Sequence, residues 1–189
     1  MTIENVRDAL PDYARDLKLN LGSVLTTNGA PGLSEKQIWS IALASAIAAR
    51  NTAFARIVEA ESRAHLAEVE VEGSKAAAAI MGMNNIYYRF LHLVEDGEYQ
   101  TMPARLRMNV IANHGIDKLD FELISLAVSA VNGCGLCVTS HEKKLRQHEV
   151  SREAIQSAVR IAATIHAVAV TWEFEQSPPA AASPAELAA

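Results

Sequence analysis

Hydrophobic residues recur at helical spacing along most of the chain, and the segment after Ser34 shows this pattern clearly. Ser34 and Gln37 have the spacing of a capping box, in which each residue bonds the backbone of the other at a helix start. Apolar and small residues then recur on one helical face from Ile38 to Ala49. The pattern predicts a largely buried helix that ends near Arg50.

Capping residues, glycines and prolines divide the other apolar segments into further helices. Asn51 and Ser151 are suited to begin helices, and Gly22 is suited to end one. The acidic stretch Glu68–Glu72 is expected to separate two helices, and Pro103 to lie in the first turn of a short one. The expected helices are Ile3–Leu10, Asp12–Leu21, Ser34–Arg50, Asn51–His65, Ser74–Val94, Met102–Asn113, Asp117 or Asp120 to Val131, Cys134–His148 and Ser151–Phe174.

The composition strengthens this helical prediction. The chain has 33 alanines among 189 residues, and Ala is the best helix former and a poor strand former. We therefore expect an all-α, single-domain helical bundle of roughly seven to nine helices over residues 1–176. Residues 177–189 are low in sequence complexity and are expected to form a disordered C-terminal tail.

The charge distribution excludes several classes of partner. Lys and Arg number 17 against 22 Asp and Glu, and the two signs are interspersed, which leaves no basic surface for nucleic acid or anionic lipid. The first residues lack the basic stretch and apolar core of a secretory signal, so we expect a cytoplasmic protein. The uncharged run from Leu123 to Ser140 approaches the length of a membrane span, but Asn132, Gly133 and two cysteines interrupt it. We expect no membrane segment.

Cys134 and Cys137 form a CxxC pair, which is too small for a stabilising disulfide framework and suits redox chemistry or metal binding. On a helix that begins at Cys134, positions 134, 137 and 141 share one face, with Cys137 and His141 adjacent. One helical turn brings the two Cα atoms within the ~4.4–6.8 Å that a disulfide requires. The positive end of the helix favours a thiolate, and the neighbouring imidazole can remove the thiol proton.

Glu122 is the only charged side chain from Phe121 to Ser140, so its surroundings are expected to be apolar. Burial raises the pKa of a carboxyl group, which would let Glu122 pass on a proton near neutral pH as the base of a thiol relay. The break at Asn132-Gly133 allows the two flanking helices to fold back against each other. A half-buried carboxylate near a helix start, where negative charge is favoured, explains Glu122 without a catalytic role.

Two other interpretations of the cysteines remain open from the pattern alone. In the first, the two cysteines are a reduced, inert and buried pair with a structural role only. Alternatively, Cys134, Cys137 and His141 hold zinc, with Glu122 or His148 as a fourth ligand, in a zinc-stabilised interaction module. The chain lacks the second CxxC or the paired histidines that usually complete such a site.

Several separated segments together carry a family resemblance that extends over nearly the whole chain. They are ALPDYA at 9–14, DLKLNL at 16–21, AIMGMNN at 79–85, LRMN at 106–109, FEL at 121–123, and SAVNGC at 129–134 with Cys137 and His141. The chain resembles the AhpD alkylhydroperoxidases, a family within the carboxymuconolactone decarboxylase-like superfamily.

The resemblance implies an all-α homotrimer that acts as an antioxidant enzyme and reduces alkyl hydroperoxides with electrons from dihydrolipoamide. In this family pattern Cys137 is the thiolate that becomes a sulfenic acid, and Cys134 is the proton donor and resolving thiol that closes the Cys134–Cys137 disulfide. Glu122 and His141 match the proton relay. The helix dipole alone would instead favour Cys134 as the attacking thiol.

The resemblance also implies partners. They are the peroxiredoxin AhpC, reduced through a mixed disulfide with Cys137, and a lipoylated dihydrolipoyl acyltransferase that works with dihydrolipoamide dehydrogenase. It implies no bound cofactor and no metal.

The chain departs from the family pattern at two positions. Leu136 stands where well-known members carry a histidine, and leucine shuttles no protons, so the relay is expected to be weaker or differently routed. His114 replaces a usual proline and is expected to affect packing. Because Leu136 replaces the family histidine, an alternative function is that of a disulfide reductase that acts on AhpC and has negligible peroxidase activity. A lactone decarboxylase is a weaker alternative, because that chemistry needs no redox pair.

Overall fold

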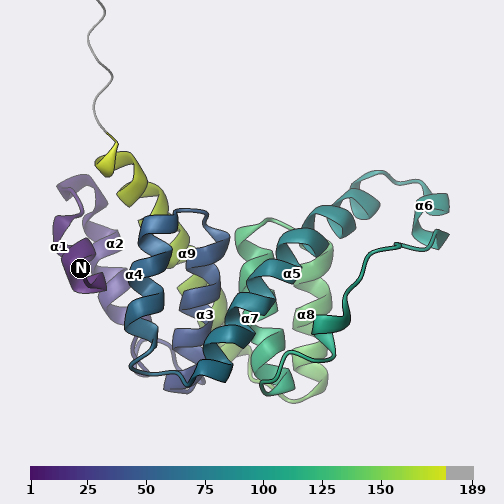
Figure 1. Ribbon diagram of the computed structural model, residues 1–189, viewed down its shortest axis with the longest axis horizontal. Helices are drawn as coiled ribbons and strands as arrows, with labels where there is room; N and C mark the ends of the chain where they lie inside the picture. The colour runs from purple at the N-terminus through teal and green to yellow at the C-terminus, as the bar shows by residue number, and fades with distance from the viewer. Residues whose placement is uncertain (178–189) are drawn as a thin grey trace, which may run out of the picture.

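The computed structural model describes residues 1–177, which form helices and turns with no strand among them (Figure 1). This confirms the all-α prediction. The helices are α1 (Ile3–Ala9), α2 (Arg15–Val24), α3 (Glu35–Ala48), α4 (Thr52–Ser62), α5 (Glu68–Leu93), α6 (Gly97–Thr101), α7 (Lys118–Val131), α8 (Gly135–Gln147) and α9 (Arg152–Gln176), with short 3₁₀ turns η1 (Asp12–Ala14) and η2 (Asn109–Ile111).

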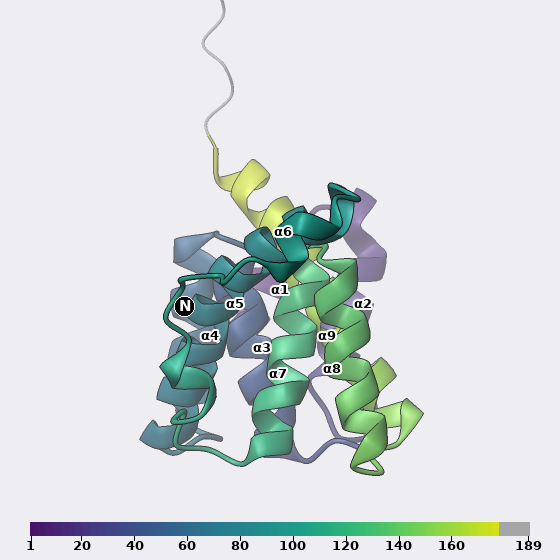
Figure 2. The same cartoon turned by 90° about the vertical axis from the view of Figure 1, so that its right-hand side faces the viewer.

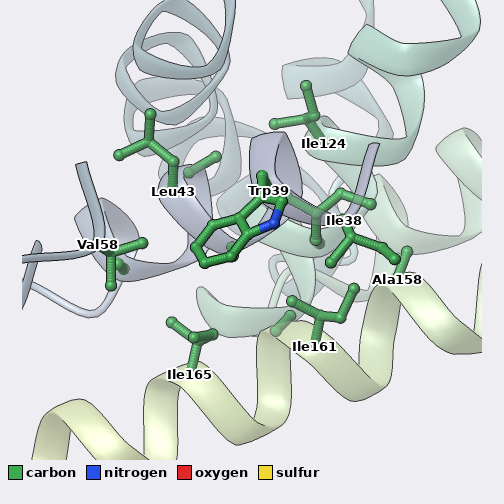
Figure 3. Packing of buried hydrophobic residues seen from close by; sticks show 14 of the residues in the cluster. Ile38, Trp39, Leu43, Val58, Ile124, Ala158, Ile161 and Ile165 are labelled. Carbon is green, nitrogen blue, oxygen red and sulfur yellow. The ribbon is translucent and has the colours of Figure 1, made fainter. Parts of the chain in front are cut away.

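Helices α3 and α7 form the centre of the bundle. Every residue from Ile38 to Ala46 in α3, and from Asp120 to Ser129 in α7, is buried. Both helices pack on α5 and α9, and α3 also packs on α4. Figure 3 shows the result, with Leu43 and other α3 side chains surrounded by residues of α4, α7 and α9. Burial on all sides explains why these two segments lack a polar face.

The predicted helix starts are confirmed by their capping geometry. Ser34 and Gln37 form the expected capping box at α3. Side chains of Asn51, Asp117 and Ser151 accept hydrogen bonds from backbone N–H groups in the first turns of α4, α7 and α9. Asp117, rather than Asp120, therefore begins α7.

Two predicted boundaries were wrong. Gly22 does not end α2, which continues through it to Val24. The acidic stretch Glu68–Glu72 does not separate two helices, because α5 begins at Glu68 and runs for 26 residues. Negative side chains are favourable in a first helical turn, so this stretch starts the helix instead of breaking it.

The short helix predicted over residues 102–113 does not form as expected. Helix α6 (Gly97–Thr101) ends before this segment, and within the segment only the turn Asn109–Ile111 is helical. Met102 is extended because a following proline disfavours helical geometry, and Arg105 has a positive φ of 52°. We call residues 94–108 the arm, and Figures 1 and 2 show that it projects from one end of the bundle, with α6 at its tip.

In the described part of the chain, α9 is the one helix long and apolar enough to cross a membrane by composition. Of its most apolar window, 56% is buried, and the helix packs on α3 and α7. Such burial is typical of the core helix of a bundle. The tail predicted for 177–189 lies, apart from Ser177, outside the described residues.

Candidate active site

A single tight turn joins α7 to α8 and sets the position of Cys134. Gly133 has a positive φ of 68°, and its N–H donates to the carbonyl of Ala130, while the N–H of Cys134 donates to that of Ser129. These two bonds form a Schellman motif, the usual glycine-dependent end of a helix. Cys134 closes α7 in this way and is also the N-cap of α8. The predicted break at Asn132-Gly133 and the predicted helix start at the first cysteine are both confirmed.

Helix α5 holds this turn from the side. The amide of Asn85 donates to Ser129 Oγ at 2.8 Å and accepts from the amide of Asn132 at 2.9 Å. Arg89, one turn further along α5, donates to the carbonyl oxygen of Asn132 at 2.7 Å. The start of α8, and with it the cysteine pair, is therefore fixed by three hydrogen bonds that involve α5.

The two cysteines lie within disulfide distance at the first turn of α8. Their Cα atoms are 5.3 Å apart and the sulfur atoms are bonded. The backbone N–H of Cys137 also donates to Sγ of Cys134 at 3.3 Å, which is the contact that would stabilise a thiolate there. Cys134 is completely buried, whereas Cys137 is 5% exposed and lies in the wall of a cavity.

Glu122 lies on α7 opposite the α8 face that carries His141. Nδ1 of His141 is 2.7 Å from Glu122 Oε2, and Nζ of Lys144 donates to Oε1 of the same carboxylate. Burial by itself would raise the pKa of Glu122, but the bonds from His141 and Lys144 outweigh it and hold the pKa below its usual value. The raised pKa predicted from the sequence is therefore wrong, and Glu122 is a carboxylate at neutral pH.

The ionised carboxylate determines what His141 can do. A carboxylate only accepts hydrogen bonds, so Nδ1 of His141 carries the proton that lies between them. In the neutral ring the other nitrogen, Nε2, is then an unprotonated acceptor. The pair is suited to take a proton at Nε2 and to stabilise the imidazolium that results.

A cavity of about 410 Å³ opens beside Cys137. Most of its wall is apolar, and the thioether of Met108 is fixed by a contact with the hydroxyl of Tyr88 at 3.8 Å. The ring of His114 stacks on Phe121, with 4.1 Å between the ring centroids. His114, which departs from the family pattern, therefore packs behind this wall. The lining residues are Met81, Asn84, Tyr88, Met108, Ile111, Phe121, Glu122, Leu136, Cys137, Ser140 and His141.

The structure brings Cys134, Cys137, His141 and Glu122 together, and it adds Lys144, which the sequence reasoning missed. Its signal was its place three residues after His141, on the same helical face. His148, proposed as a zinc ligand, is exposed at the end of α8. Within residues 1–177 no three His, Cys, Asp or Glu side chains are arranged to hold a metal ion, so the zinc hypothesis lacks a ligand set there.

A helical bundle that places a bonded CxxC pair at a helix start, beside a carboxylate–imidazole pair, defines a class of proteins whose site is suited to dithiol–disulfide exchange. Comparison with known proteins narrows this class. The carboxymuconolactone decarboxylase family pattern matches residues 97–175, which contain both cysteines, Glu122 and His141.

Curated relatives cover the chain almost completely. The alkyl hydroperoxide reductase AhpD of Gluconacetobacter diazotrophicus is 57% identical over 173 residues, which are 92% of this chain and 93% of the relative. The AhpD proteins of Rhodospirillum centenum and Frankia alni are each 54% identical, over 93% and 92% of this chain and 92% of each relative. The chain belongs to the AhpD family.

Proposed function

We propose that the chain reduces alkyl hydroperoxides through its Cys134/Cys137 dithiol, with dihydrolipoamide as electron donor, and that it also regenerates the peroxiredoxin AhpC. The observation that carries the proposal is the position of Cys137, which lies in the wall of an apolar cavity together with His141 and Glu122. The relatives named alkyl hydroperoxide reductase support the same reaction class.

Accessibility supports Cys137 as the thiol that attacks the peroxide. Cys134 has the better electrostatic position, because it is the N-cap residue and receives a backbone N–H. It is nevertheless completely buried and is not part of the cavity wall, so a substrate in the cavity meets Cys137 first. Cys134 then serves as proton donor and resolving thiol.

The chemistry balances with the groups present. His141 accepts the thiol proton of Cys137 at Nε2, and the thiolate attacks the terminal peroxide oxygen, which forms an S–O bond and breaks the O–O bond. The alkoxide that leaves takes the proton of Cys134 and departs as an alcohol. The Cys134 thiolate then attacks the sulfenic acid of Cys137, which forms the disulfide and releases hydroxide. His141 protonates that hydroxide to water, and Glu122 stabilises the imidazolium in between.

The proposed electron supply returns the disulfide to the dithiol. Dihydrolipoamide carries two thiols, so it can reduce Cys134–Cys137 by two exchange steps, and we propose that its apolar chain enters the cavity beside Cys137. We place a lipoylated dihydrolipoyl acyltransferase and dihydrolipoamide dehydrogenase upstream, in the cytoplasm. AhpC is the proposed downstream partner, through a mixed disulfide with Cys137.

A second candidate function is supported by Leu136. This side chain is 39% exposed and contributes to the cavity wall beside Cys137, so the position between the cysteines supplies an apolar contact and no imidazole. A chain without that proton carrier suits thiol–disulfide exchange with AhpC better than direct attack on a peroxide. The alternative is an AhpC disulfide reductase with negligible peroxidase activity of its own.

One coupled assay tests both candidates. NADH consumption is followed with dihydrolipoamide dehydrogenase, lipoamide and cumene hydroperoxide, first without AhpC and then with it. We expect turnover without AhpC that falls to background in Cys137→Ser, because the attacking sulfur is lost. His148→Gln, at the exposed end of α8, is the control and is expected to retain full activity. Turnover only with AhpC would establish the adaptor function, and no turnover in either series would refute both.

We also propose that the chain forms a homotrimer through its arm. Large apolar side chains are exposed along the arm and the adjoining end of α5, and α6 has only five residues, too few for a helix that is stable alone. A second copy packed on this surface would bury it. The exposed residues are Ile86, Phe90, Leu93, Val94, Tyr99, Met102 and Leu106.

A further inference from the structure

Asn84 is a polar residue in the wall of the cavity, and its contacts show no role in the fold. It lies on α5, is 4% exposed, and lines the cavity together with Cys137 and His141. Its carbonyl oxygen Oδ1 is enclosed and has no hydrogen-bond partner. A buried acceptor without a partner lowers the stability of the fold, so such a group calls for an explanation.

The next residue shows what a structural asparagine looks like at this site. Asn85 is also buried, but its amide group both donates to Ser129 and accepts from Asn132. Asn84 lies about 100° around the helix from Asn85 and lines the cavity, as do the apolar Met81 and Phe121 and the polar Ser140 and His141. Its carboxamide torsion is soft, so Oδ1 can turn toward a donor that enters the cavity.

We propose that Asn84 recognises the hydroperoxide group of the substrate. Its Oδ1 accepts a hydrogen bond from the terminal O–H of an organic hydroperoxide, whose organic part lies against the apolar wall. This bond holds the terminal oxygen, the one that the thiolate attacks, on the side of Cys137. The O–O bond then breaks as described above, and the O–H hydrogen stays on the oxygen that becomes the sulfenic acid.

The inference rests on the proposed peroxidase function, and one experiment separates the two. Fully reduced protein is mixed with cumene hydroperoxide in a single turnover, and the loss of its two thiols is timed in wild type and in Asn84→Leu. Leucine has nearly the shape of asparagine but offers no acceptor. We expect the rate constant of thiol loss to be about 3- to 10-fold lower in Asn84→Leu, which corresponds to the loss of one neutral hydrogen bond.

A reagent without a hydrogen-bond donor provides the internal control. Methyl methanethiosulfonate modifies the Cys137 thiolate but has no O–H, so its rate is expected to be unchanged in Asn84→Leu. The thermal midpoint is expected to be unchanged or higher, because the unpaired acceptor is gone, whereas Asn85→Leu lowers it. Asn84→Ala, which needs no repacking, is a second variant with the same expected direction.

The outcomes distinguish the possible failures. Equal peroxide rates in wild type and Asn84→Leu would overturn the role of Asn84 and leave the peroxidase function standing. An equal slowing with both reagents would show that Asn84 acts on the thiol and not on the peroxide, which also overturns it. If wild-type thiols react with methyl methanethiosulfonate but not with the hydroperoxide, the proposed function fails and this inference fails with it.

Discussion

Glu122 shows how two hydrogen-bond donors can keep a buried acid ionised. Its side chain is 8% exposed, yet it meets His141 at one oxygen and Lys144 at the other. Burial penalises the charge, and the two hydrogen bonds more than compensate, so the pKa of Glu122 is lowered. The carboxylate therefore positions His141 and stabilises its charged form, and it does not itself carry protons at neutral pH.

This balance predicts a pH-dependent effect of Lys144→Met. Because the pKa of folded Glu122 lies below its usual 4.5, the ion pair stabilises the protein above that pH and stops doing so as pH falls through the folded pKa. Lys144 is half exposed, so its share is expected to be about 0.5 kcal/mol at pH 7. Thermal midpoints of wild type and variant should differ at pH 7 and converge toward pH 3.

Lys143→Met is the matched control for this prediction, since Lys143 is an exposed neighbour on α8 with no ion pair in the described residues. Its thermal midpoint is expected to follow wild type at every pH. A destabilisation by Lys144→Met that is the same at pH 7 and pH 3 would show that the lysine acts through packing of its stem.

The sequence identified four of the site residues and missed two, for physical reasons. The spacing of Cys134, Cys137 and His141 on one helical face is a local property, so it could be predicted. Contact between Glu122 and His141 depends on how α7 folds against α8, and there the sequence supplied only the permissive break between them. Lys144 lies three residues after His141 on the same helical face, but that spacing alone does not place it beside Glu122. Asn84 gives no signal, because a helical asparagine becomes informative only through its neighbours.

At the scale of elements, the turn between α7 and α8 depends on one backbone conformation. Gly133→Ala is expected to lower the free energy of unfolding by about 1–2 kcal/mol, the cost of a left-handed conformation in a residue with a Cβ. The reason is backbone strain alone, because a Cβ at Gly133 would meet no atom within 4 Å. Urea denaturation of the reduced proteins measures the difference.

Gly135→Ala provides the comparison. Gly135 is the first residue of α8, a Cβ there also meets nothing within 4 Å, and its φ is not positive. This variant is expected to be neutral or about 0.5 kcal/mol more stable, because alanine loses less entropy on folding. Equal destabilisation by both variants would mean that bulk beside Cys134, and not the left-handed turn, limits the site.

The helices themselves could be predicted where a cap or an apolar face defines them, as for α3, α4, α7 and α9. The prediction failed at two segments, for different reasons. Acidic residues at Glu68–Glu72 suggested a linker but belong to a long helix that is stabilised by packing on α3 and α7. Residues 102–113 carry helical spacing, but Met102 before proline and the positive φ of Arg105 keep the chain out of the helix.

At the scale of the whole molecule, the cavity and the arm lie at the same end of the bundle, because α5 contributes to both. Asn84 and Tyr88 line the cavity, and the same helix continues into the exposed residues Phe90 and Leu93. The ring of Phe90 meets that of Tyr99 edge to face at 5.3 Å, which ties the arm to the end of α5. Assembly through the arm would therefore stiffen the helix that holds the turn before Cys134.

This connection leads to a prediction about assembly. Sedimentation equilibrium of wild type is expected to give three times the mass of the 20.4 kDa chain. Leu93→Asp is expected to give the mass of a single chain, because a charge at a buried apolar contact is costly. Leu19→Asp is the matched control, because Leu19 is 65% exposed and Leu93 68%, but Leu19 lies on α2, at the other end of the molecule (Figure 1). If Leu19→Asp dissociates the assembly and Leu93→Asp does not, the subunits meet at the N-terminal helices and the arm needs another partner.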